Sequence, residues 1–373
     1  MKKMLLITSL IFSVVLLSSC AGKNVVKPGD QNEVPKVTTP VPKVTTPIVE
    51  NTDSQVGKVL PTIKDYFSYK ENTKYVYEGK GNEYAAKDVS VDYLTGNRVQ
   101  LRSSNGGTVM GEVLENKNGQ LSKIFSRPEF YYREDLTGKP SSKAEVMLKE
   151  PLVKGTTWTI ADNIKRTISN VDVNITTPSG KYKTIEVTTQ NKDSKNLDYY
   201  APNVGLVKSL YVAKDMEVST TLSKIEKNAK ITQTVKFYYP NVVEDKLYFV
   251  NKELSFNTND ITKSILEKAF KDLPKGNENL GKVLSQNAKI KSLYLNNDNM
   301  VYVDFTKEFV SEMNAGSGYE GMILQCITNT LGSYYGVDRV YITVEGSPYS
   351  SGHILMKKGE AFTVNVKNSI ELK

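Results

Sequence analysis

Val301-Tyr302-Val303-Asp304-Phe305-Thr306-Lys307-Glu308-Phe309, in the last third of the chain, alternates apolar and polar side chains over its first five residues. Val301, Val303 and Phe305 therefore share one face, which predicts a half-buried strand. A helical pattern follows over residues 318–335, with Met322, Ile323, Cys326, Ile327, Thr330 and Leu331 at the inward positions. A strand followed by such a helix indicates an α+β layer, in which helices pack on a sheet.

Further strands and another helix surround this stretch within residues 231–373. Alternation predicts strands over residues 234–240, 247–256, 290–295 and 340–344, and Pro240 is expected to stop the first of them. Apolar residues at helical spacing follow Asn259-Asp260, which we expect to cap a helix that begins near Ile261. The predicted order for this segment is ββαββαβ.

Residues 57–230 predict a different architecture, an all-β domain built as a meander or half-barrel. Short alternating runs are separated by turn signals, and a pair such as Asn-Gly between such runs predicts a hairpin. The signals are Thr95-Gly96, Asn105-Gly106, Asn118-Gly119 and Ser179-Gly180. Trp158 is interpreted as a core anchor, with stacking on a sugar as the alternative. Residues 199–208 resemble a strand-turn-strand found in secreted β-sheet domains of bacterial envelope proteins.

The N-terminus predicts export and lipidation. Lys2 and Lys3 precede an apolar run over residues 5–17 and then Leu-Ser-Ser-Cys, which ends at Cys20. A basic start, a short apolar core and small residues indicate a signal peptide over residues 1–19. The sequence Leu17-Ser18-Ser19-Cys20 resembles the lipobox of bacterial lipoproteins. Diacylglycerol on the Cys20 thiol, with acyl chains such as palmitate, would hold the chain on the outer face of the cell membrane.

Residues 20–56 predict a linker. They contain a direct repeat, residues 34–40 and 41–47, in which regular prolines favour extended polyproline II and no apolar face is present to build a core. We interpret this segment as a passive tether between the anchor and the folded domains.

Charge and cysteine content narrow the class of protein. The formal net charge is +8, or +6 once Lys2 and Lys3 leave with the signal peptide, and the lysines are spread along the chain. Nucleic-acid binding is therefore not expected, whereas mild attraction to anionic lipid or wall polymer is. Lipidation of Cys20 leaves Cys326 without a partner, so we predict no internal disulfide and read Cys326 as a small buried hydrophobe.

Motifs that could carry chemistry mostly have simpler interpretations. Residues 316–321 fit the dinucleotide pattern G-x-G-x-x-G, but a parallel strand should lead directly into it. Ser317 and Glu320 instead have the spacing of a capping box, which we predict at the start of the helix. His353 is the only histidine, so a His-based zinc site is not expected, and we interpret it as a polar turn residue. Asp304 and Glu308 need not share a face.

Residues 234–357 resemble the GerMN domain, also called the sporulation and spore germination domain. The resemblance rests on several blocks in order, which are residues 235–240, 301–309, 316–321, 325–331 and 337–346. It implies a non-enzymatic envelope lipoprotein that assembles or stabilises a sporulation or germination complex, without a cofactor. The best-known member has two such domains, whereas one is found in this sequence.

The leading hypothesis is thus a lipid-anchored, non-catalytic protein that binds an envelope protein partner, with the cell wall as a further candidate. A second hypothesis is a ligand- or lipid-binding half-barrel, which an apolar-lined cavity in residues 57–230 would favour. A third is a peptidoglycan hydrolase with Asp304 or Glu320 in its site, since two carboxylates flanking a cleft can cleave a glycosidic bond.

Overall fold

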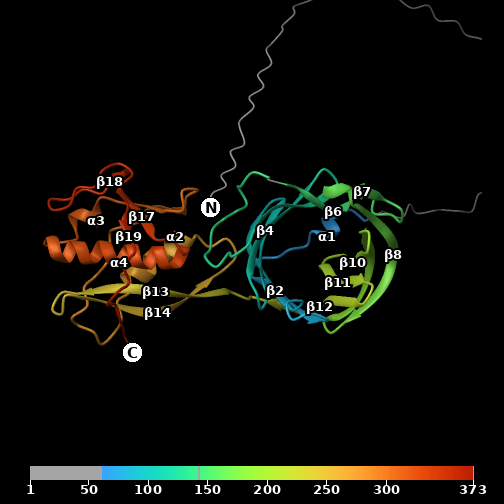
Figure 1. Ribbon diagram of the computed structural model, residues 1–373, viewed down its shortest axis with the longest axis horizontal. Helices are drawn as coiled ribbons and strands as arrows, with labels where there is room; N and C mark the ends of the chain where they lie inside the picture. Colours follow the sequence, from blue (N-terminus) through green and yellow to red (C-terminus); the bar gives the residue numbers. More distant parts are fainter. Residues whose placement is uncertain (1–60, 142, 373) are drawn as a thin grey trace, which may run out of the picture. The chain divides into compact units, whose positions relative to one another are not determined.

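Alternating side chains along residues 73–227 build one antiparallel sheet of twelve strands, in the order β6-β5-β4-β3-β2-β1-β12-β11-β10-β9-β8-β7 (Figure 1). The strands are β1 (Thr73–Lys80), β2 (Lys87–Thr95), β3 (Arg98–Ser104), β4 (Val109–Lys117), β5 (Gln120–Arg127), β6 (Glu145–Lys149), β7 (Thr157–Thr159), β8 (Lys165–Thr177), β9 (Gly180–Gln190), β10 (Ser194–Ala201), β11 (Gly205–Ala213) and β12 (Met216–Lys227). The prediction of an all-β meander is confirmed.

The computed structural model describes residues 61–372 except residue 142. The predicted signal peptide, Cys20 and the linker lie outside the described residues. We call residues 61–230 the β domain and residues 231–372 the C-terminal domain. Both belong to one compact unit, Val59–Lys373.

Tight turns at the predicted positions connect neighbouring strands. Asn118 and Gly119, between β4 and β5, have φ angles of 53° and 68°. Positive φ at both central residues is the geometry that matches the twist of a two-residue hairpin, and asparagine and glycine adopt it at low cost. The strand-turn-strand at residues 199–208 is also present, as the end of β10 and the start of β11.

The sheet curls until its two end strands approach each other (Figure 1). No backbone ladder between β6 and β7 is found among the described residues, and side chains join this seam instead. Trp158 Nε1 donates to the Val146 carbonyl at 2.9 Å, and Arg166 Nη1 donates to the same oxygen at 2.8 Å. Trp158 is 6% exposed, so its predicted role as a core anchor is confirmed.

The inner face of the curled sheet holds an apolar core. A short helix, α1 (Ile63–Tyr66), buries both of its end residues against this core. The 3₁₀ turn η1 (Ala161–Asn163) joins β7 to β8. Core side chains come from most of the strands, among them Val99, Leu121, Ile168, Val187, Val207 and Leu222.

The C-terminal domain contains helices and two further sheets. Its elements are β13 (Ile231–Asn241), β14 (Lys246–Phe256), α2 (Thr262–Lys271), β15 (Ile290–Leu295), β16 (Val301–Phe305), α3 (Glu308–Ser311), α4 (Ser317–Tyr335), β17 (Arg339–Val344), β18 (Ser347–Pro348), β19 (Phe362–Thr363) and β20 (Ile370–Glu371). The sheets have the orders β13-β14-β20 and β15-β16-β17-β18, and β19 pairs with β17. The predicted order lacked α3 and the three short strands, and it assumed a single sheet.

Two local predictions in this domain are wrong. Pro240 does not stop the first strand, because β13 lies at an edge of its sheet, where a missing backbone N–H is tolerated. Asn259 and Asp260 do not cap α2, whose N-cap is Ile261 without a side-chain hydrogen bond. The Asn259 side chain instead accepts a hydrogen bond from the Leu94 backbone N–H at 2.8 Å, in the β domain.

A buried arginine joins the two domains. Arg133 is fully buried, and its Nε lies 2.6 Å from Asp92 Oδ1 in β2. The same guanidinium donates to the backbone carbonyls of Asn257 and Asp260, which lead into α2. The Arg133 backbone N–H donates to the Tyr334 hydroxyl of α4 at 3.0 Å.

Apolar contacts follow the same junction. Val113, Ile124, Phe130, Tyr132 and Leu136 of the β domain belong to the core cluster of the C-terminal domain. The outer face of β4 and β5 is therefore buried, and residues 128–139 form part of the joint. No helix within residues 61–372 is both long and apolar enough to cross a membrane.

Candidate functional site

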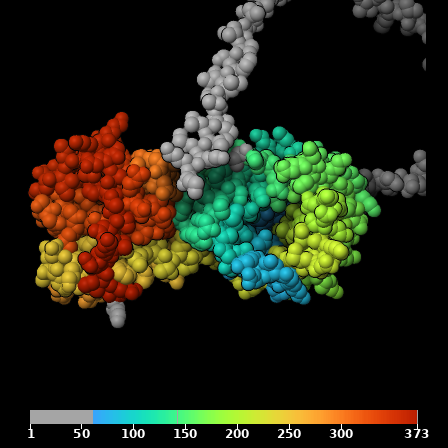
Figure 2. Space-filling view, viewed as in Figure 1, coloured from blue at the N-terminus to red at the C-terminus, as the bar shows by residue number. Residues whose placement is uncertain are grey.

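The β domain contains a cavity of about 280 Å³ on the inner face of the curled sheet. Figure 2 shows the domain hollowed at this place, between the strands of its first half and those of its second half. The lining comes from α1, the segment after it, and strands β1 to β6, β8 and β10 to β12. It includes Tyr66, Tyr69, Tyr75, Tyr77, Lys87, Glu112, Lys123, Glu145, Arg166, Asp198, Tyr200, Ser209 and Thr220.

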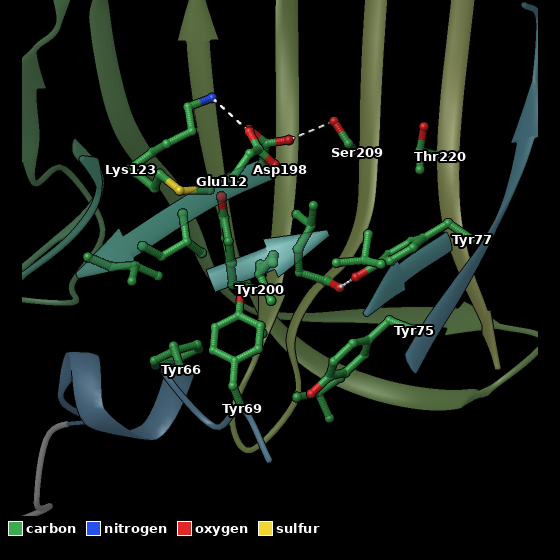
Figure 3. Close-up of a pocket in the computed structure, with 18 of the residues that line it drawn as sticks. Tyr66, Tyr69, Tyr75, Tyr77, Glu112, Lys123, Asp198, Tyr200, Ser209 and Thr220 are labelled. Atoms are coloured by element: carbon green, nitrogen blue, oxygen red, sulfur yellow. Dashed lines mark hydrogen bonds and ion pairs between the residues drawn. The ribbon is translucent and has the colours of Figure 1, made fainter. Parts of the chain in front are cut away.

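Tyrosines gather at the α1 end of the cavity (Figure 3). The rings of Tyr69 and Tyr75 pack edge-to-face, with 6.1 Å between their centroids. Tyr77 donates its hydroxyl to the Leu206 carbonyl at 2.9 Å. The hydroxyls of Tyr69, Tyr75 and Tyr200 make no hydrogen bond to any residue of the described chain. Burial raises the pKa of Tyr75 to about 12, so these hydroxyls are neutral donors at neutral pH.

Charged side chains line the opposite side, farther from α1 (Figure 3). Lys123 Nζ lies 3.4 Å from both Glu112 Oε1 and Glu145 Oε2, and Arg166 Nη2 lies 2.7 Å from Glu145 Oε1. Burial lowers the pKa of Lys123, but the two carboxylates outweigh burial and the net shift is upward. These four groups form one continuous chain of ion pairs that neutralises itself.

Asp198 lies outside this chain of ion pairs. Its carboxylate accepts a hydrogen bond from Ser209 Oγ at 2.7 Å, and no cation of the described chain lies within 4.0 Å of it. Burial raises the pKa of Asp198 above its ordinary value, although hydrogen bonds from Ser209 and Asn196 and the more distant charges of Arg166 and Lys87 act in the opposite direction. A partly buried carboxylate without a cationic partner is energetically unfavourable, so it provides a ready contact for a positively charged ligand.

Lys87 is the other charged lining residue that has no ion pair among the residues described. Its Nζ lies 5.6 Å from the centroid of the Tyr77 ring. The cavity thus combines aromatic rings, free hydroxyls, and one carboxylate and one ammonium group that each lack a direct ion pair in the described chain. Such a set of groups can bind and orient a small polar molecule. It contains no serine or cysteine beside a histidine, because the only histidine, His353, lies in the C-terminal domain.

A second cluster surrounds Glu320 in α4, next to a pocket of about 480 Å³. The Glu320 carboxylate accepts hydrogen bonds from the hydroxyls of Tyr349 at 2.8 Å and Ser351 at 2.5 Å. His353 Nδ1 lies 2.7 Å from Glu320 Oε2. Glu320 is 2% exposed, and its carboxylate accepts hydrogen bonds from three side chains of the loop that follows β18.

The predicted capping box at Ser317 and Glu320 is therefore wrong. Gly316 is the N-cap of α4, and no side-chain hydrogen bond caps the helix. The Glu320 side chain is already occupied by partners more than 28 residues away in sequence, so it does not fold back to the helix start. His353, interpreted as a turn residue, is in fact paired with this carboxylate.

The other sequence-predicted residues lie apart from both clusters. Asp304 Oδ1 accepts hydrogen bonds from Thr343 Oγ1 at 2.7 Å and from the Gly346 backbone N–H at 2.8 Å, so it secures the turn after β17. Cys326 is fully buried and free, as predicted. Cys20 lies outside the described residues. No group of three or more His, Cys, Asp or Glu side chains suited to a metal is found in residues 61–372.

Sequence reasoning missed the cavity residues, although a signal for them exists. In a strand, residues two apart share a face. Glu112 lies two residues before Leu114, Arg166 two before Ile168 and Asp198 two before Tyr200, and each of these three neighbours is buried. A charged residue two positions from a buried residue in the same strand is therefore expected to point into the interior of the domain.

Comparison with protein families identifies one part of the chain. Residues 236–350 match the Germane family, described as "Sporulation and spore germination". The chain thus carries a GerMN-type domain, which the resemblance over residues 234–357 indicated. The match covers less than a third of the chain. No curated protein sequence matches it.

Solved structures give weaker likenesses. The tandem GerMN domains of the sporulation protein GerM from Bacillus subtilis are 21% identical, over 34% of this chain and 45% of that one, with a TM-score of 0.26. An exported-protein candidate with a YmcC-like fold from Bacteroides fragilis is 14% identical, over 43% of this chain and 99% of that one, with a TM-score of 0.29. A candidate lipoprotein from Clostridium perfringens is 18% identical, over 36% of this chain and 87% of that one, with a TM-score of 0.24.

Proposed function

We propose that this protein is a lipid-anchored, non-catalytic envelope protein that acts in sporulation or spore germination through protein–protein contacts. The observation that carries the proposal is the family match over residues 236–350. The N-terminal sequence supports the location, because an apolar run ending in Leu-Ser-Ser-Cys at Cys20 is typical of a lipoprotein signal.

The junction between the domains supports a scaffold role. Arg133 connects Asp92 of the β domain with the start of α2, and it does so in a fully buried position. A protein that positions partners benefits from domains that move together, and a buried, multiply bonded arginine favours one arrangement over others. The C-terminal domain would then be presented at a fixed orientation to the β domain.

The test is genetic and biochemical. Deletion of the gene in the natural host should lower the yield of heat-resistant spores or slow their germination, and the full chain should restore both. Crosslinking of the lipidated protein in sporulating cells, followed by mass spectrometry, should capture one or a few envelope proteins. A null strain that grows, sporulates and germinates normally would contradict the proposal, as would capture of glycans alone.

Peptidoglycan hydrolysis is the enzymatic alternative, and the geometry gives it little support. The carboxylate of Glu320 is held by three side chains, and Asp304 is bound to Thr343 and Gly346. Purified protein incubated with peptidoglycan should release no soluble muropeptides. Release that disappears in Glu320→Gln would instead establish the hydrolase.

Ligand binding is the second candidate function, and one specific observation favours it. The β domain is not filled, since it holds the cavity of about 280 Å³. Apolar side chains such as Leu114 and Leu121 line part of the wall. Unlike the wall expected of a lipid carrier, it also has six charged side chains: Lys87, Glu112, Lys123, Glu145, Arg166 and Asp198.

A further inference from the structure

We propose that the cavity of the β domain binds a small polar molecule that carries a positively charged amine, and that Asp198 is the residue that pairs with the amine. This inference is independent of the role in sporulation, since it rests only on residues of the β domain.

The charges of the wall point to a cation. Glu112, Lys123, Glu145 and Arg166 satisfy one another through ion pairs of 2.7–3.4 Å. Asp198 has hydrogen-bond donors but no cation within 4.0 Å among the described residues, and Arg166 and Lys87 act on it only from a longer distance. A partly buried charge is more favourable with a close ionic partner, so a ligand ammonium beside Asp198 would supply the direct ion pair that the wall does not provide. A neutral polyol would add no ion pair to that carboxylate.

The aromatic side of the cavity fits the same ligand. A cation within about 6 Å of an aromatic ring centroid is attracted to the ring face. Tyr69, Tyr75 and Tyr200 supply rings, and their hydroxyls have no partner in the described chain. Ser209 and Thr220 add hydroxyls on the charged side (Figure 3). A ligand with both an amine and hydrogen-bonding groups would therefore meet a complementary surface.

Size and charge argue against the rival ligands. Ligand pockets usually measure about 300–1,000 Å³, so this cavity takes one small molecule. An acyl chain could contact the apolar part of the wall, but it would also cover six charged side chains and cut them off from water, which is unfavourable. An anion would find Lys123 and Arg166 already neutralised, and Lys87 already acts on Asp198 and lies near the Tyr77 ring.

The experiment compares amines with neutral molecules of the same shape. Isothermal titration calorimetry on residues 21–373, which retain the linker and lack only the predicted signal peptide and Cys20, would use choline against 3,3-dimethylbutanol, glucosamine against glucose, and cadaverine against pentane-1,5-diol. The single tryptophan, Trp158, lies at the seam beside Glu145 and Arg166, so its fluorescence gives a second readout. At least one amine should bind about tenfold or more tightly than its neutral counterpart.

Variants locate the site. Asp198→Asn should remove the preference for the amine, because it removes the charge and keeps the shape. The control is Asp172→Asn, whose side chain is 57% exposed and pairs with Lys183 on the surface, and its binding should be unchanged. Circular dichroism and thermal unfolding would confirm that both variants fold.

Three results would overturn the inference. They are equal binding of each amine and its neutral counterpart, no binding of any amine in the panel, and an amine preference that survives in Asp198→Asn. A lipid found by mass spectrometry in the purified protein would also contradict it. None of these results affects the role in sporulation, which the gene deletion tests separately.

Discussion

Glu320 is a carboxylate with 2% of its surface exposed, and it accepts hydrogen bonds from side chains of the loop that follows β18. Burial raises the pKa of Glu320, but the hydrogen bonds from Ser351, His353 and Tyr349 outweigh burial, so the pKa lies below its ordinary value of 4.5. The ionised form is therefore the one that stabilises the fold. A hydrogen bond to a charged group contributes about 1.5–3 kcal/mol.

Glu320→Gln should lower the free energy of unfolding at neutral pH by about 2 kcal/mol, because the charged acceptor is lost. Since the folded pKa is depressed, the contribution of Glu320 is fully present above 4.5 and disappears as the pH falls through the folded value. Urea unfolding at several pH values should show the gap between parent and variant closing under acid conditions. The control, Glu278→Gln, changes an exposed residue and should match the parent at every pH. A gap that persists below the folded pKa would contradict this account.

At the scale of elements, β4 packs closely against residues 128–139. Gly111 in β4 leaves no room for a side chain, since a Cβ placed there would lie 2.7 Å from Phe130 Cδ1. Phe130 itself is fully buried, and the Arg102 guanidinium donates a hydrogen bond to its carbonyl. The Arg102 Cζ atom lies 4.5 Å from the centroid of the Phe130 ring. This close approach places the segment that contains Arg133.

Gly111→Ala should destabilise the protein by about 1–3 kcal/mol, because an added methyl group forces the Phe130 ring or the strand to move. The measurement is chemical denaturation monitored by circular dichroism. Gly96→Ala is the matched control in the same sheet, since a Cβ at that turn meets nothing within 4 Å. Equal denaturation midpoints for the two variants would show that the close contact with Phe130 does not prevent a larger side chain at position 111.

Arg133→Met should cost about 1.5–3 kcal/mol, because the buried Asp92 would lose the closer of its two arginine partners and keep only Arg102, at 3.2 Å. The same change removes the hydrogen bonds to Asn257 and Asp260, so the two domains should unfold in separate steps in place of one. Differential scanning calorimetry would reveal the second transition. Lys183→Met, which removes an exposed partner of Asp172, should cost less than about 1 kcal/mol and keep one transition.

For the whole molecule, the proposed anchor determines where the domains act. Two acyl chains bury enough methylene groups, at about 0.8 kcal/mol each, for durable attachment to a bilayer. The predicted linker of residues 20–56 would separate this anchor from the unit of residues 59–373. Placement on the membrane is thus expected to depend on one sulfur atom.

Cys20→Ser should abolish lipidation and move the protein from the membrane fraction to the soluble or secreted fraction, which immunoblotting of fractionated cells would measure. Cys326→Ala is the control, because Cys326 is buried in the C-terminal domain and has no role in anchoring. Retention of Cys20→Ser on membranes at the parental level would disprove anchoring through that residue.

Local patterns determine much of this protein. Alternating residues identify the strands, because the period of two is a property of the extended backbone itself. Positive φ at Asn118 and Gly119 follows from their residue types, and the burial of Trp158 and Cys326 follows from their apolar surroundings. The family of residues 236–350 is also visible in the order of its sequence blocks.

Tertiary structure alone decides which distant groups meet. Sequence spacing predicts Glu320 as a capping residue, but in the fold its carboxylate binds side chains of residues 349–353. Sequence likewise predicts Asn259 as a helix cap, but its side chain binds the backbone of β2. Asp198 and Tyr69 are 129 positions apart in the chain, yet they line one cavity, because both lie on the inside of the same curled sheet. The physical reason is that hydrogen bonds and ion pairs are satisfied by whichever partner the folded chain brings within about 3 Å, and sequence spacing fixes that partner only within a turn or a strand.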